Sequence, residues 1–234
     1  MTEATFQSIQ LDRPDGQLCG IALGDQPDLL LLHAGGEHAG VFKTVMRGLL
    51  DAGFGSIAYD QRGHGRSLKE GADSLPNFAD DAAAMLAPLN KPVAVGCSLG
   101  GLSLISGISK MGRAANIAGL VLLDVTPELN APAVDGFLDG AQEIDPGAPL
   151  VRDIISRADD LRDACRQLSL PLLLVRAGKD TPLTDASVEH FLGYMPHANV
   201  LTIPDATHLV AQSAPEALTD VLIDVANTHK APVG

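Results

Sequence analysis

The chain alternates between short apolar segments and longer segments whose apolar residues recur at helical spacing. This alternation is typical of a mostly parallel β-sheet flanked by helices, the α/β class. Several of the apolar segments contain no regular polar positions, which indicates strands that are covered on both faces. The expected strands are Ile21–Leu23, Leu29–His33, Ser56–Tyr59, Pro92–Val95, Gly119–Asp124, Pro171–Ala177 and Asn199–Ile203.

Segments between the expected strands place their apolar residues on one helical face. They lie within 41–50, 188–195 and 218–225, and a further helix, Leu99–Lys110, is expected directly after an apolar strand. Because each helical face has a sheet face to cover, we predict one α/β domain over residues 1–234.

Residues 125–167 interrupt the alternation of expected strands and helices, since they are rich in Pro, Gly and acidic residues. They show only weak helical patterns, at Ala133–Leu138, Val151–Arg157 and Leu161–Leu168. We interpret 125–167 as a short cap inserted over one edge of the sheet. The last residues, His229–Gly234, are expected to form a frayed tail.

Composition and charge narrow the possible partners. The chain carries 29 acidic and 16 basic residues, a formal net charge of −13, and no cluster of Lys and Arg. This charge repels phosphate backbones and anionic lipid, so we expect no nucleic acid and no membrane surface as a partner. A small-molecule substrate fits this composition better. The composition does not decide whether the protein forms a homodimer.

The cysteines and the N-terminal sequence indicate the cellular compartment of the protein. The 3 cysteines show no C-x-x-C spacing, which predicts neither a disulfide framework nor a zinc site. The N-terminus lacks the basic and apolar regions of a signal peptide, and no apolar segment approaches the roughly 20 residues of a membrane span. We therefore expect a soluble, cytoplasmic protein.

The segment VGCSLGGL, from Val95 to Leu102, predicts a sharp strand-to-helix turn at Ser98. Such a turn requires small residues two positions before and after its centre, and Gly96 and Gly100 meet that requirement. It would expose the hydroxyl above the strand ends and direct the Leu99 N–H to the same point. An ordinary capping serine is the simpler alternative. A phosphate-binding loop fits less well, because its lysine is missing.

A serine hydroxyl becomes a useful nucleophile when a histidine takes its proton and a carboxylate orients that histidine. Asp180 follows the expected strand Pro171–Ala177, and His208 follows Asn199–Ile203. The order Ser98, Asp180, His208 is the nucleophile, acid and base order of one known hydrolase fold.

Ordered motifs along nearly the whole chain resemble those of the α/β-hydrolase superfamily, in its esterase, lactonase and perhydrolase-like branch. They are LLLLHAGG, YDQRGHGRS, VGCSLGG, LVLLDVTP, AGKD and DATHLVAQSAPEAL. The resemblance implies that Ser98 is the nucleophile, His208 the general base and then acid, and Asp180 the orienting carboxylate. Asp124 is the alternative acid, because some members take it from the end of the sixth strand.

The same resemblance implies an oxyanion hole made of the Leu99 N–H and one N–H of the 33–37 loop. Gly35 is the expected donor and Gly36 the alternative. Ala34 stands where the family commonly has glycine, and Gly35-Gly36-Glu37 replaces the frequent aromatic-proline pair. Glu37 is therefore included among the candidate substrate-binding residues, although a solvated loop position is the simpler reading.

Other polar residues receive structural interpretations. His33, Glu37 and His38 do not match zinc spacing, so we expect no metal and predict that His33 braces its loop by hydrogen bonding. The resemblance assigns Asp60 and Arg62, with His64, to a structural turn that ties loops together rather than to an acid-base set, and the glycines of the segment agree with a turn. The Cys97 side chain, next to the nucleophile, is expected to pack in the core.

These features predict a serine hydrolase that cleaves a carboxylic ester, lactone or similar acyl bond without a cofactor. The same triad also fits C–C bond hydrolysis, thioester hydrolysis, perhydrolysis and cofactor-free lyase chemistry. Haloalkane dehalogenase and epoxide hydrolase activities are disfavoured, because they need an acid where Ser98 stands. A ligand-binding protein without turnover is the alternative from another class.

Overall fold

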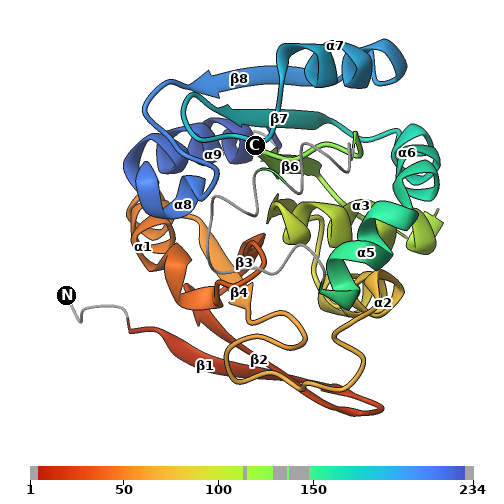
Figure 1. The fold of residues 1–234 in the computed structure, drawn as a ribbon. Helices are drawn as coiled ribbons and strands as arrows, with labels where there is room; N and C mark the ends of the chain where they lie inside the picture. The colour runs from red at the N-terminus through yellow and green to blue at the C-terminus, as the bar shows by residue number, and fades with distance from the viewer. Residues whose placement is uncertain (1–4, 113–114, 129–135, 137–147, 230–234) are drawn as a thin grey trace.

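The computed structural model describes residues 5–112, 115–128, 136 and 148–229 (Figure 1). Its strands form one 8-stranded sheet in the order β1-β2-β4-β3-β5-β6-β7-β8. The bounds are β1 Gln7–Arg13, β2 Gly16–Leu23, β3 Pro27–Leu32, β4 Gly55–Tyr59, β5 Val93–Cys97, β6 Gly119–Leu123, β7 Leu172–Ala177 and β8 Asn199–Ile203.

Helices connect the strands and cover both faces of the sheet (Figure 1). Their bounds are η1 Ala39–Phe42, a 3-10 helix, then α1 Lys43–Asp51, α2 Leu75–Leu86, α3 Leu99–Met111, α5 Pro149–Ser156, α6 Ala158–Arg166, α7 Asp185–Tyr194, α8 Val210–Ser213 and α9 Pro215–His229. Within the described part of the chain, no helix is long and apolar enough to cross a membrane.

The pairing of the strands brings many loops to one edge of the sheet. β1 and β2 pair antiparallel, as do β2 and β4, whereas the pairs from β4 through β3 to β8 are parallel. The predicted mostly parallel α/β sheet is confirmed. Parallel strands end on the same edge, so the loops that follow β3 to β8 all lie there.

Alternate strand residues enter two separate cores, because successive side chains point to opposite faces of a sheet. In β3, Leu30 and Leu32 belong to one core and Leu29 and Leu31 to the other. α2, α3, α6 and α7 supply the first core, while α1, α8 and α9 supply the second. Figure 1 shows these two groups of helices on opposite sides of the sheet.

The structure contains a strand at each position where the sequence predicts one, together with an additional strand, β1. α5 and α6 overlap the weak helical patterns predicted at Val151–Arg157 and Leu161–Leu168. The pattern at Ala133–Leu138 lies outside the described residues except for Gly136, so the cap over 125–167 stays a prediction. α9 continues to His229, the first residue of the expected tail.

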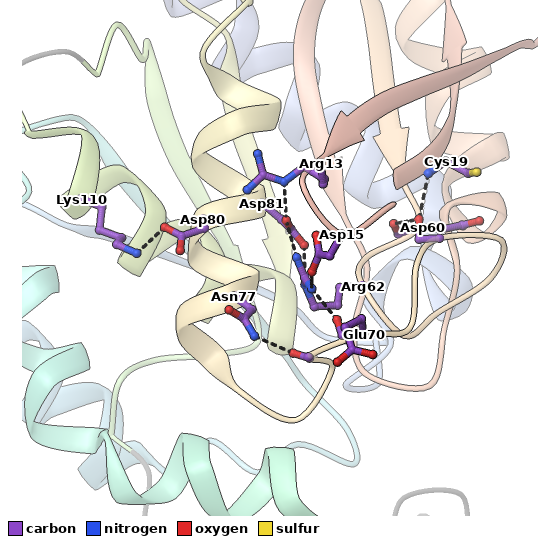
Figure 2. A network of polar contacts seen from close by, with 12 residues as sticks. Arg13, Asp15, Cys19, Asp60, Arg62, Glu70, Asn77, Asp80, Asp81 and Lys110 are labelled. Atoms are coloured by element: carbon purple, nitrogen blue, oxygen red, sulfur yellow. Dashed lines mark hydrogen bonds and ion pairs between the residues drawn. The ribbon is translucent and has the colours of Figure 1, made fainter. Parts of the chain in front are cut away.

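Buried and partly buried ion pairs hold the turn after β4 to its surroundings (Figure 2). The guanidinium of Arg62 donates to Asp81 on α2 at 2.9 and 3.0 Å and to Asp15 in the β1–β2 hairpin at 2.6 Å. Asp81 also accepts from Arg13 at 2.8 Å. Burial opposes the charge on Arg62, but these carboxylates raise the pKa of Arg62 above its ordinary value. The predicted structural role of this turn agrees with these contacts.

Candidate active site

Ser98 occupies a strained turn between β5 and α3. Its backbone angles are φ 47° and ψ −114°, a region that non-glycine residues rarely adopt. A Cβ added at Gly96 would lie 2.5 Å from the backbone carbon of Gly100, and one added at Gly100 would lie 2.5 Å from the carbonyl oxygen of Leu32. Both positions therefore require glycine, as the motif predicts.

Hydrogen bonds bring the loops after β6 and β8 against the Ser98 turn. The Ser98 N–H donates to the Leu123 carbonyl at 3.3 Å, and Asp124 is the next residue. Cys97, which precedes Ser98, has its Sγ 3.5 Å from the carbonyl oxygen of His208. Ser98, Asp124 and His208 are thereby gathered at the carboxyl ends of β5, β6 and β8.

His208 pairs with Asp124. The ring Nδ1 of His208 lies 2.8 Å from Oδ2 of Asp124, whose side chain is fully buried. The other oxygen, Oδ1, accepts from the Ala177 N–H at 2.9 Å and from the Thr181 hydroxyl at 2.8 Å. A carboxylate held by fixed donors in this way directs the proton of His208 to Nδ1 and orients the ring.

The expected partner of His208, Asp180, does not occupy this place. Asp180 is exposed, and it contacts His208 through its backbone, where its carbonyl oxygen accepts from the His208 N–H at 3.3 Å. The loop after β7 instead directs the Thr181 hydroxyl inward, to Asp124. In the structure, the carboxylate beside His208 is therefore that of the predicted alternative, Asp124, and not that of Asp180.

The loop after β3 offers three consecutive backbone N–H groups. Ala34 donates to Oε2 of Glu37 at 2.9 Å, and Gly36 donates to Nε2 of His64 at 3.0 Å. Gly35 lies between them, and its N–H donates to no group in the described part of the chain. Gly36, the predicted alternative donor, is thus already engaged, whereas Gly35 is available.

Glu37 is buried, with 8% of its surface exposed, so the expectation of a solvated loop residue is wrong. Its carboxylate accepts from the Ala34 N–H and, at 2.5 Å, from the side-chain amide of Gln212 on α8. His38 is exposed and accepts the Gly40 N–H at 3.1 Å, where it caps η1. Glu37 therefore binds the loop to α8, whereas His38 caps η1.

Both ring nitrogens of His33 are engaged. Nδ1 lies 2.7 Å from the Ala34 carbonyl oxygen, and Nε2 accepts the Gln61 N–H at 2.9 Å. Burial lowers the pKa of His33 to about 4, so the ring is neutral at pH 7. The predicted bracing role is confirmed. Among the described residues, no group of three His, Cys, Asp or Glu side chains is arranged to hold a metal ion.

His33 predicts a loss of stability in acid. The unfolded chain protonates His33 below its ordinary pKa of 6.5, whereas the folded protein resists protonation down to about pH 4. The free energy of unfolding should therefore fall by ~3 kcal/mol as the pH decreases through this range. Urea unfolding at about pH 7 and about pH 4.5 should show a drop ~2 kcal/mol smaller in His33→Gln than in the wild type. The same drop in both proteins would contradict this, and the exposed His197→Gln is the matched control.

Cys97 packs beneath the site, as predicted, with 1% of its surface exposed. Burial raises the pKa of its thiol well above the usual range, and the nearby carboxylates of Glu37 and Asp124 raise it further. The thiol is therefore unreactive and serves as a contact for the backbone of His208.

Several residues that complete this arrangement are assigned no site role by a recognisable sequence pattern. Thr181 supports Asp124, Gln212 binds Glu37, and His64 holds the amide of Gly36. Gln212 lies four residues after His208 on the same loop and helix, which is the one spacing that could have drawn attention to it.

Comparison with known proteins decides the family. The family model described as "Alpha/beta hydrolase family" matches residues 29–221. The chain belongs to this family. The expectation of an α/β-hydrolase enzyme is thereby confirmed.

Individual relatives agree with this family. The chain is 26% identical to a 2-(acetamidomethylene)succinate hydrolase of Mesorhizobium japonicum, over 82% of this chain and 85% of that one. It is 28% identical to an esterase of Mycobacterium tuberculosis, over 88% and 85%. The crystal structure of an E-2-(acetamidomethylene)succinate hydrolase superposes with a TM-score of 0.79 at 24% identity, covering 95% of this chain and all of the other. That superposition supports the fold.

Proposed function

We propose that the protein hydrolyses a carboxylic ester or a related acyl bond of a small molecule through an acyl-enzyme on Ser98. The observation that carries this proposal is the contact between His208 Nδ1 and the buried Asp124, next to the strained serine turn. A histidine whose Nδ1–H is held by a carboxylate presents Nε2 as the base.

In the first half of the proposed reaction, Ser98 Oγ attacks the acyl carbonyl while His208 removes its proton. The carbonyl oxygen gains negative charge, which the N–H groups of Leu99 and Gly35 are available to stabilise. Leu99 is the first residue of α3, so the positive end of this helix acts on the same oxygen. Protonated His208 then donates its proton to the leaving alcohol, and the acyl group stays on Ser98.

In the second half, His208 removes a proton from water, and the resulting hydroxide attacks the acyl-enzyme. The same N–H groups stabilise the second tetrahedral intermediate. Ser98 leaves with the proton from His208, and the carboxylic acid is released. Asp124, whose Oδ1 is held by two fixed donors, stabilises the imidazolium form of His208 in both halves.

The relatives guide the choice of substrates to test. One is described as an esterase, and another acts on a succinate that carries an acetamido group. A panel of activated esters, lactones, thioesters and acetamides, each with and without a carboxylate, therefore covers the acyl chemistry open to this triad. C–C bond cleavage and perhydrolysis are tested on the same purified protein.

Labelling with a fluorophosphonate probe tests the proposal without assuming a substrate. The folded protein should take up one equivalent of probe, and mass spectrometry should place it on Ser98. Heat-denatured protein should not react. A label on another residue, or no label and no turnover of any substrate in the panel, would contradict the proposal and favour a ligand-binding protein.

A further inference from the structure

Two side chains, those of Glu37 and His64, hold the loop after β3 in place. Of its consecutive amides, Ala34 is bound by Glu37 and Gly36 by His64. The amide between them, that of Gly35, is the proposed oxyanion donor. Fixing both neighbours of Gly35 restricts the direction in which its N–H can point.

Glu37 is also bound to the segment that carries the proposed base. Its Oε1 accepts from Gln212 Nε2 at 2.5 Å, and Gln212 lies four residues after His208 in the chain. Removal of an ionised carboxylate from water is costly unless hydrogen bonds compensate, and both oxygens of Glu37 have a donor. One buried carboxylate thus joins the two loops that must act together on a substrate.

Asp124 and Glu37 bind opposite ends of the segment 208–212. Asp124, after β6, holds the ring of His208, whereas Glu37, after β3, holds Gln212. Both carboxylates lie close enough to the buried Cys97 to influence its thiol, and Cys97 itself contacts the backbone of His208. The segment 208–212 is therefore fastened from both sides of β5.

From these contacts we infer that Glu37 is a positioning residue, which fixes the Gly35 amide relative to His208 through its bonds to Ala34 and Gln212. This inference rests on the proposed function. Both carboxylate oxygens of Glu37 are occupied by Ala34 and Gln212, so its action is exerted through these two residues. Its effect is on the geometry of the oxyanion hole, so it acts in the transition state more than in substrate binding.

Kinetics of Glu37 variants on an activated ester test the inference. Glu37→Ala should lower kcat roughly 30- to 100-fold, because a misplaced oxyanion donor costs about this much, and should change KM less than about threefold. Glu37→Gln should keep kcat within about fivefold of the wild type. Its carbonyl oxygen can accept from Ala34, and Gln212 can turn its own amide to accept from the new one.

Gln212→Ala provides a second test that leaves Glu37 in place. Gln212 is exposed, so this change is compatible with folding, and kcat should fall about 3- to 10-fold. The double variant Glu37→Ala/Gln212→Ala should be no slower than Glu37→Ala alone, because both changes break one connection. Glu189→Ala, which removes an exposed carboxylate on α7, is the matched control and should match the wild type.

Three outcomes of these kinetic measurements would overturn the inference. A wild-type kcat in both Glu37→Ala and Gln212→Ala would overturn the inference, as would a change confined to KM. A loss in Glu37→Gln as large as that in Glu37→Ala would also overturn it, because hydrogen-bond geometry would then not be the cause. Labelling of Ser98 in the wild type tests the proposed function separately, because that function makes no prediction about Glu37. If Ser98 is labelled and the Glu37 variants keep the wild-type kcat, the inference alone fails.

Discussion

Replacing Ser98 with alanine is expected to lower kcat for an activated ester by roughly 10⁴- to 10⁶-fold, because alanine lacks the hydroxyl that forms the proposed acyl-enzyme. The substitution should leave the fold intact. Serine and alanine suffer similar strain at φ 47°, so the free energy of unfolding should change little. Ester kinetics and urea unfolding of the same preparation measure the two effects separately.

Ser98→Gly adds a sharper version of this test. Glycine adopts the φ and ψ of the turn without strain, so this variant should be ~1 kcal/mol more stable than Ser98→Ala and equally inactive. Ser106→Ala, in the same helix, is the matched control and should keep wild-type turnover. Wild-type turnover by Ser98→Ala would exclude Ser98 as the nucleophile.

Much of the sheet was predictable because its strands are buried on both faces and therefore read as uninterrupted apolar segments. β1 is different. Among the described strands it pairs with β2 alone, and its residues are exposed or half-buried, so it lacks the uninterrupted apolar segment that marks the buried strands. α2 was also missed. Asp81 lies on its buried side, where Arg62 and Arg13 neutralise it, and a charge at that position hides the apolar periodicity of the helix.

The positions of Ser98 and His208 follow from local patterns, but the choice of acid does not. Asp124 and Asp180 both follow a buried strand and both have positive φ, at 51° and 42°. Contacts between loops distinguish the two aspartates. Ala177 and Thr181 bind the carboxylate of Asp124, whereas the side chain of Asp180 is exposed to solvent. Chain order favoured Asp180, whereas hydrogen bonds across the sheet favour Asp124.

Asp124→Asn is accordingly expected to lower kcat by about 10⁴-fold without unfolding the protein. Asparagine has the shape of aspartate and tolerates positive φ. The donors Ala177 N–H and Thr181 hydroxyl require the amide oxygen to take the place of Oδ1. The amide NH₂ then faces Nδ1 of His208, which favours the tautomer with its proton on Nε2, and that nitrogen can no longer accept the proton of Ser98.

Asp180→Asn is the matched control, because it makes the same chemical change at an exposed aspartate with positive φ on a neighbouring loop. Its kcat should stay within about threefold of the wild type. The pH dependence adds a second readout: a neutral neighbour disfavours the imidazolium, so residual activity in Asp124→Asn should rise as hydroxide increases. If Asp180→Asn is the slower variant and both are folded, the carboxylate that supports His208 during turnover is Asp180, and the contact with Asp124 serves the folded structure alone.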